Sequence, residues 1–184
     1  GQTIEEAKEA LNMDIVRVYE PKDVSRESVN ILNYDRLHVI DGYKPTSVVL
    51  DESSILKSHD GAYRRQIQEF FYYADYKLAC TATPSPNDYT ELGTHSEFVG
   101  AMSRLEMFAT FFTHDGGDTS KWRLKKHAQG DFWRWLSTWA VVLQHPRDIG
   151  YDMPGYDLPA LHIHDHSVTV ASSVAGGLCG DGAI

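Results

Sequence analysis

Two apolar runs in the middle of the chain each end in a short polar motif. Val48-Val49-Leu50 is followed by Asp51-Glu52, and Leu78-Ala79-Cys80 is followed by Thr81-Ala82-Thr83. Short apolar runs bounded by polar residues are typical of buried strands in a parallel sheet. Because parallel strands end at a common edge, where open α/β folds bind their ligands, we expect the acids and the threonines to meet there.

The acidic pair has a well-defined chemistry. One carboxylate can hold Mg²⁺, directly or through water, while the other orients or deprotonates an attacking water. This division of labour serves the hydrolysis of phosphate esters and nucleotides. The hydroxyls of Thr81 and Thr83 would hydrogen-bond the acidic loop. The pattern therefore favours Asp51 as a metal ligand and Glu52 as the residue that acts on water.

The rest of the chain alternates between the two periodicities. A capping box at Thr3 and Glu6 predicts a first helix, and the apolar spacing predicts another over residues 60–74. The β-α-β rhythm implies a doubly wound, mostly parallel sheet with right-handed crossovers. The helices are expected at 3–12 and 60–74, and the strands at 15–19, 29–33, 47–51 and 76–80.

Beyond Pro84 the rhythm becomes helical. Residues 88–112 and 129–143 carry apolar groups at helical spacing, with a turn expected at 114–118 between them. The aromatic stripe of the second segment is interpreted as core packing rather than as a base-stacking platform. The domain division that we expect is 1–112 for the α/β part, 113–160 for a helical and aromatic extension, and 161–184 for a flexible tail or the start of a further lobe.

Four segments together resemble superfamily-two helicases and translocases, in particular the phage and prokaryotic type related to chromatin-remodelling ATPases. The acidic motif resembles their Asp-Glu box, and the threonine motif resembles their coupling motif, at a similar spacing. The resemblance covers roughly residues 1–160. Its segments are Val29-Asn30-Ile31-Leu32-Asn33-Tyr34-Asp35-Arg36-Leu37, Asp51-Glu52-Ser53-Ser54, Thr81-Ala82-Thr83-Pro84 and Pro86-Asn87-Asp88-Tyr89 through Glu91-Leu92-Gly93.

The resemblance implies a RecA-like first lobe of the P-loop NTPase type, in a DNA- or RNA-dependent ATP hydrolase that uses Mg²⁺. Asp51 would bind the metal and Glu52 would act on water. Ser54, Thr81 and Thr83 would couple the nucleotide state to the grip on nucleic acid, although better-known relatives carry Asp or His where Ser54 stands. The nucleic-acid contacts implied by the resemblance are Asn33, Tyr34 and Arg36.

The chain lacks parts that such an enzyme needs. No Gly-Lys pair of a phosphate-binding loop occurs, and too little sequence follows residue 160 for a second lobe that would supply an arginine finger. We therefore expect an incomplete lobe that is inactive alone and holds no tightly bound cofactor. Its expected partners are nucleic acid, the missing second lobe and a second copy of the chain paired through the exposed fragment edge.

Composition sets further bounds. The net charge is −9 and apolar residues make up 42% of the chain, which fits a globular protein but not a wholly basic nucleic-acid binder. The local candidates for a phosphate-tracking groove are Lys121, Arg123 and Lys125, which are interleaved with Trp122. Two cysteines and the lack of a membrane-spanning run or a leader-like start predict a cytoplasmic protein that makes no membrane contact.

Two other functions are compatible with the same residues. A metal-dependent hydrolase would use Asp51 and Glu52 with His162, His164 and His166, which would share one face of a strand. Histidines spaced in this way fan out along a strand, which argues against a shared zinc ion. A non-catalytic module that binds nucleic acid or protein would keep the fold without the chemistry.

Overall fold

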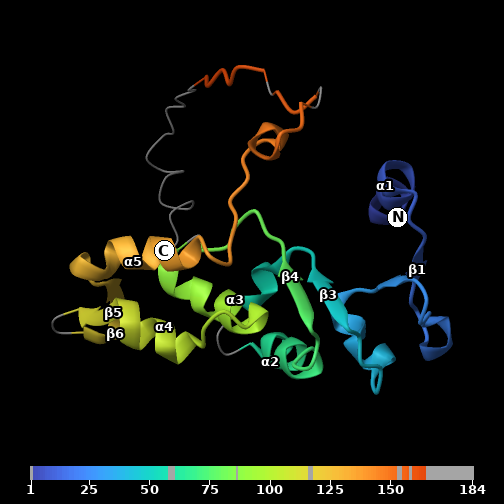
Figure 1. The fold of residues 1–184 in the computed structure, drawn as a ribbon, viewed down its shortest axis with the longest axis horizontal. Coiled ribbons are helices and arrows are strands. Elements are labelled where there is room, and N and C mark those ends of the chain that lie inside the picture. The colour runs from blue at the N-terminus through green and yellow to red at the C-terminus, as the bar shows by residue number, and fades with distance from the viewer. Residues whose placement is uncertain are drawn as a thin grey trace, which may run out of the picture. The chain divides into compact units, whose positions relative to one another are not determined.

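The computed structural model describes residues 2–57, 61–85, 87–115, 118–152, 155–157 and 159–164. The chain divides into two compact units, Gly1–Ala140 and Val141–Ile184. In the described residues, helices are combined with three two-stranded sheets. The protein is therefore a mixed α/β protein (Figure 1).

The first sheet is a parallel pair near the N-terminus. Helix α1 precedes β1, and the chain returns to β2 through a short 3-10 helix. Asp23 fixes this return, because its carboxylate accepts hydrogen bonds from the backbone N–H groups of Tyr19 and Glu20 at 3.0 and 2.9 Å. The bounds are α1 Gln2–Leu11, β1 Ile15–Arg17, η1 Pro21–Asp23 and β2 Val29–Ile31.

The second sheet carries both polar motifs. Strands β3 (Ser47–Leu50) and β4 (Tyr76–Ala79) pair in parallel, with Val49 opposite Leu78. The crossover between them consists of the 3-10 helix η3 (Ser53–Leu56) and helix α2 (Ala62–Phe70). Figure 1 shows β3 and β4 side by side. This pair confirms the sequence-based expectation of two short strands joined by a helical crossover.

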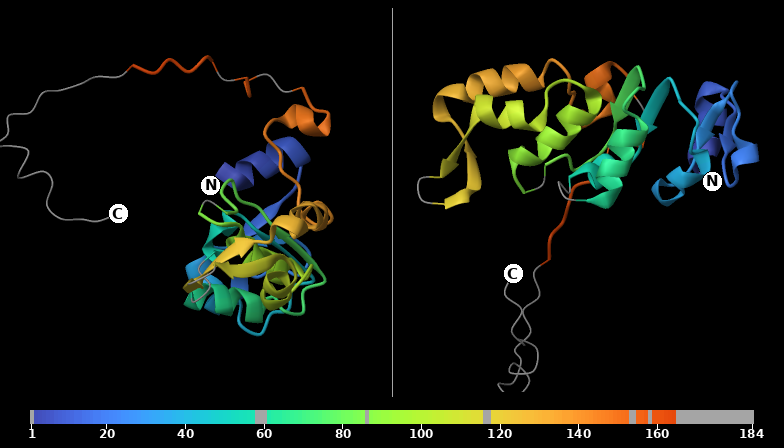
Figure 2. Two further views of the ribbon diagram at one scale, coloured as in Figure 1. Left: turned by 90° about the vertical axis from the view of Figure 1, so that its left-hand side faces the viewer. Right: turned by 90° about the horizontal axis from the view of Figure 1, so that it is seen from below.

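The remaining elements follow β4. Figure 2 shows the hairpin of β5 and β6 as a narrow antiparallel ribbon directly after α4. The turn expected at 114–118 thus lies within a hairpin, although residues 116–117 are outside the described part. The bounds are η4 Tyr89–Glu91, α3 Leu92–Val99, α4 Arg104–Phe111, β5 Phe112–Asp115, β6 Asp118–Leu124, η5 Lys126–Ala128, α5 Gln129–Leu136 and η6 Pro146–Ile149.

The helical segment expected over 88–112 is divided into separate helices. Gly100 ends α3 in the left-handed conformation, with φ of 79°, which glycine adopts without a steric penalty. Ser103 then begins α4 through a capping box with Glu106. A glycine followed by a serine therefore interrupts a pattern whose apolar spacing alone predicted continuity.

Two hydrophobic clusters stabilise the first unit. One cluster gathers around Leu50, Leu56 and Ile67, beneath the β3–β4 sheet. The other contains residues of α3, α4, β5 and α5, with Phe132 fully buried among aromatic neighbours. This packing confirms the interpretation of Phe132 and Trp135 as core, whereas Trp133 remains 41% exposed. Helix α5 ends at Leu136, short of the residue 143 expected from the apolar spacing.

The doubly wound sheet expected from the sequence is not formed in the described part of the chain. Among the described residues, the parallel strands pair only as β1 with β2 and β3 with β4. After β2 the chain enters the 3-10 helix η2 (Tyr34–Ile40). The three-residue strands β1 and β2 form one pair, and the four-residue strands β3 and β4 form another. The expectation failed because the apolar pattern predicts strands but not which strands are neighbours.

No helix in the described residues is both long enough and apolar enough to span a bilayer.

Candidate functional site

The two polar motifs lie at the same edge of the β3–β4 sheet. The backbone ladder continues past both strands, since the N–H of Cys80 donates to the carbonyl of Leu50 at 2.8 Å. The N–H of Ser53 then donates to the carbonyl of Cys80, also at 2.8 Å. The acidic loop and the threonine loop are therefore tied together at the carboxyl ends of their strands, as the sequence predicted. We call this edge the strand-tip rim, comprising residues 51–54 and 80–83.

The acidic tip has a strained backbone. Glu52 has φ and ψ of 49°, in the left-handed region that residues other than glycine rarely adopt. Its N–H donates to Oδ1 of Asp51 at 3.0 Å. Both side chains are exposed, so the two carboxylates face water. Such outliers persist where the surrounding structure holds them, and they cluster at functional positions.

A lysine links the acidic loop to the threonine loop. Nζ of Lys57 donates to Oγ1 of Thr83 at 2.9 Å, and the N–H of Thr83 donates to Oγ1 of Thr81 at 3.1 Å. Ser54 instead donates to the carbonyl of Glu52 at 3.4 Å. The contact expected between Ser54 and the threonines is therefore made by Lys57. No motif in the sequence marked this lysine.

A buried polar pair supports the rim from below. Oγ of Ser53 lies 3.3 Å from Nε2 of His95 on α3, and the two residues are 0% and 4% exposed. Nδ1 of His95 is buried, and no described residue forms a direct hydrogen bond with it. Burial lowers the pKa of His95 from its ordinary 6.5, so the neutral ring is favoured. Sequence analysis missed this pair because its members are 42 residues apart.

Tyr34 also supports the rim. Its hydroxyl donates to the backbone carbonyl of Asp51 at 2.6 Å. Partial burial, together with the nearby negative charge of Asp51, raises the pKa of Tyr34 to about 12. Burial likewise raises the pKa of the Cys80 thiol, with Asp51 adding to the effect, which makes this thiol a poor nucleophile. Tyr34 was predicted to contact nucleic acid, but here it supports the acidic loop.

The other predicted nucleic-acid residues do not assemble at the rim. Asn33 and Arg36 line a cavity beside the first sheet. Lys121 and Arg123 belong to β6, and Lys125 follows that strand. Nζ of Lys125 donates to the carbonyls of Ala109 and Thr110 at 2.8 and 3.0 Å, so it satisfies the C-terminal end of α4.

The proposed histidine site has no support in the described residues. His162 and His164 are exposed and lie in a stretch without regular secondary structure. His166 lies outside the described residues. Across the described ranges, no three His, Cys, Asp or Glu side chains are grouped closely enough to hold a metal ion.

The outward face of the same sheet is apolar and uncovered. Val48, Leu50 and Ala79 point into the hydrophobic core. On the other face, Val49 is 64% exposed and its direct neighbour Leu78 is 54% exposed. Tyr76, two residues before Leu78, is 70% exposed. We call these three residues the outer face of the sheet.

Comparison with known proteins gives a match to a protein-family model. Residues 16–83 match the family model of OstA-like protein. The matched segment is less than half of the chain, and it includes β2, β3 and β4 and all of β1 except Ile15. Searches of the curated proteins and of the solved structures returned no match.

This match contradicts the resemblance to superfamily-two helicases. The matching model covers both the Asp-Glu and the threonine motifs and belongs to another family, and nothing in the comparisons points to a helicase. The interpretations as a DNA-binding or RNA-binding ATPase, as a RecA-like lobe and as a P-loop fold are therefore wrong on this finding, as are the partners inferred from them. Four short segments, two of which lie close together in the fold, were insufficient to identify a family.

Proposed function

We propose that this chain is a protein-binding module that docks a partner on the outer face of the β3–β4 sheet. The observation that carries the proposal is the paired exposure of Val49 and Leu78, directly opposite each other on parallel strands. Parallel sheets are normally covered on both faces, usually by helices. The partner segment with the best fit is therefore an amphipathic helix whose apolar side rests on the outer face.

The outer face has the composition of a binding surface. Full burial of a Val or Leu side chain contributes about 1.5–3 kcal/mol, and each of these two residues is already partly covered. Covering both would thus contribute roughly 2 kcal/mol. Tyr76 adds an aromatic side chain of the kind enriched at the energetic centres of interfaces. Tyr72 and Tyr73, which are also exposed, lie just before β4 in the chain.

The family match indicates a process for this docking. Residues 16–83 include both β3 and β4, and the OstA-like family belongs to lipopolysaccharide transport. We therefore expect the docked partner to be a protein of lipopolysaccharide transport. OstA-like proteins are often periplasmic, so this proposal favours the periplasm over the cytoplasm that the cysteine content suggested.

Site-specific photo-crosslinking tests the docking proposal. A benzophenone side chain would be placed at Val49 or Leu78 in cells of the source organism, and crosslinked species would be identified by mass spectrometry. Leu105 on α4 is 78% exposed and serves as a matched control. We expect one discrete partner from positions 49 and 78 and none from 105. Equal labelling at all three positions, or none at any, would refute the docking surface.

The rim carries a second proposal, which concerns Mg²⁺. We propose that Asp51, with Glu52, holds a hydrated magnesium ion, because both carboxylates are exposed at one strand tip and Mg²⁺ commonly binds one or two carboxylates while keeping its waters. An NMR titration with MgCl₂ should shift the amide resonances of residues 51–54 and leave those of α5 unchanged. The same shifts in the Asp51→Asn variant would contradict the assignment.

A further inference from the structure

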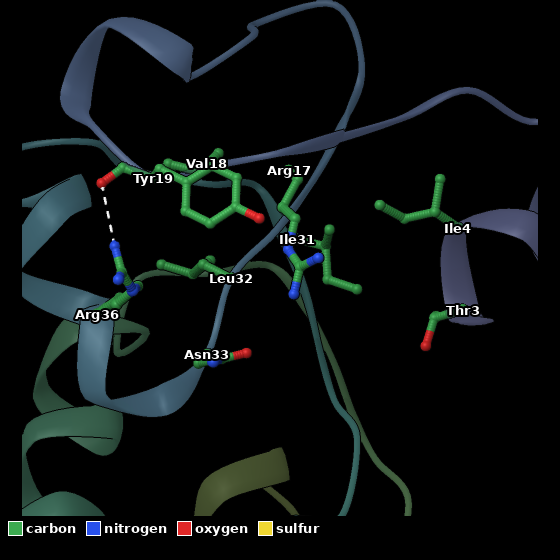
Figure 3. Close-up of a pocket in the computed structure, with 9 residues that line it drawn as sticks. All are labelled: Thr3, Ile4, Arg17, Val18, Tyr19, Ile31, Leu32, Asn33 and Arg36. Carbon is green, nitrogen blue, oxygen red and sulfur yellow. Dashed lines mark hydrogen bonds between the residues drawn. The ribbon is translucent and has the colours of Figure 1, made fainter. Parts of the chain in front are cut away.

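A cavity of about 230 Å³ lies at the first parallel sheet. Its walls come from α1, from the ends of β1 and β2, and from η2, so it lies where the carboxyl ends of two parallel strands meet (Figure 3). Ligands of open α/β folds bind at this end of the strands. The cavity is separate from the strand-tip rim and from the outer face of β3–β4.

The polar lining of the cavity is basic. Arg17 and Arg36 both line it, and none of the nine lining residues is acidic. The chain has a net charge of −9, so this lining is a local concentration of positive charge in an acidic protein. Asn33 and Thr3 add an amide and a hydroxyl. These groups are all capable of donating hydrogen bonds to an anion.

One aromatic ring organises the two arginines. The guanidinium carbons of Arg17 and Arg36 lie 5.3 and 5.6 Å from the centroid of the Tyr19 ring, and Figure 3 shows that ring between the two side chains. Nη1 of Arg36 also donates to the carbonyl of Tyr19 at 3.4 Å. Two like charges near one ring repel each other, so an anion bound within reach of both would be stabilising.

We propose that this cavity binds a phosphate monoester. A phosphate dianion matches two guanidinium charges, and the planar donor fork of arginine fits phosphate oxygens in a bidentate manner. Val18, Ile31 and Leu32 supply an apolar wall for the first carbons of the esterified group. The volume suits a phosphorylated head group rather than a whole cofactor. The proposal does not depend on the docking surface, because the two sites share no residue.

A lipid head group and a soluble phosphate ester share this chemistry, and separate measurements distinguish them. Binding of glycerol 3-phosphate would be followed by NMR titration. Binding to membranes would be followed by flotation with phosphatidylcholine vesicles that contain phosphatidic acid, and with pure phosphatidylcholine vesicles as the blank. Shifts confined to the cavity residues support the proposal. If these shifts occur and the protein also floats with the phosphatidic acid vesicles, the ligand is a lipid head group. If the shifts occur and the protein does not float, the ligand is a soluble ester.

Charge-matched variants complete the test. We expect Arg17→Gln and Arg36→Gln each to weaken binding by about tenfold or more, since each removes a charge-assisted pair of hydrogen bonds. Arg65→Gln on α2 makes the same change in net charge on an exposed residue outside the cavity and should leave binding unchanged. Arg17 is exposed, so Arg17→Gln should fold normally. It therefore keeps the test valid even if Arg36→Gln fails to fold. The proposal is overturned if neither probe binds, or if Arg65→Gln weakens binding as much as Arg17→Gln and Arg36→Gln do.

Discussion

Removal of the Ser53 hydroxyl gives the sharpest test of how the strand-tip rim is supported. Ser53 and His95 are both buried, and their side chains meet at 3.3 Å. In the Ser53→Ala variant, the His95 ring would lose its hydrogen bond to the Ser53 hydroxyl. An unsatisfied buried polar group costs about 1–3 kcal/mol. With a urea m-value of about 2 kcal/mol per molar, a 2 kcal/mol loss moves the unfolding midpoint down by about 1 M.

Equilibrium urea denaturation, followed by circular dichroism, measures this shift. The matched control is Ser54→Ala, because Ser54 is the adjacent serine and makes only a 3.4 Å contact with the Glu52 carbonyl. We expect the control to change stability by less than about 0.5 kcal/mol. In a His95→Leu background, Ser53→Ala should cost little, since no imidazole remains to be left unpaired. The reasoning fails if Ser53→Ala costs the same in both backgrounds.

Three further results are expected. Burial keeps the pKa of folded His95 below 6.5, so the unfolded chain binds more protons than the folded chain at mildly acidic pH. The free energy of unfolding should therefore fall as the pH drops from 7 through 6.5 toward 5. The variant His95→Leu should flatten this slope in urea melts. Gly93→Ala should lower Tm, because the added Cβ would lie 2.9 Å from Arg104 Cγ and from Met107 Cε. By contrast, a Cβ added at Gly130 on α5 would meet nothing within 4 Å, so Gly130→Ala should raise stability by about 0.5–1 kcal/mol. Phe132→Ala, at a fully buried ring, should cost about 3–5 kcal/mol in a denaturant titration.

Much of the local structure followed from the sequence. The apolar runs at 48–50 and 78–80 became β3 and β4, and the helical spacing at 60–74 became α2. These elements were predictable because side-chain periodicity reflects which face of an element is buried. The meeting of the acidic and threonine loops was also predictable, because parallel strands place their carboxyl ends at one edge.

The partners of those elements were not predictable. The strands formed separate pairs rather than one sheet, and strand order depends on contacts between distant segments. Lys57, Tyr34 and His95 support the rim through contacts that span 26, 17 and 42 residues. A lone lysine, tyrosine or histidine gives no local signal of such a role.

The sequence by itself determined the four parallel strands with helices α1 and α2, and that two carboxylates and two threonines would occupy one edge of a sheet. Only the tertiary structure decided that Val49 and Leu78 are uncovered, that Arg17 and Arg36 share a cavity, and that Ser53 is buried against His95. The physical reason is that periodicity is a property of neighbouring residues, whereas exposure and side-chain pairing depend on which distant segments pack together.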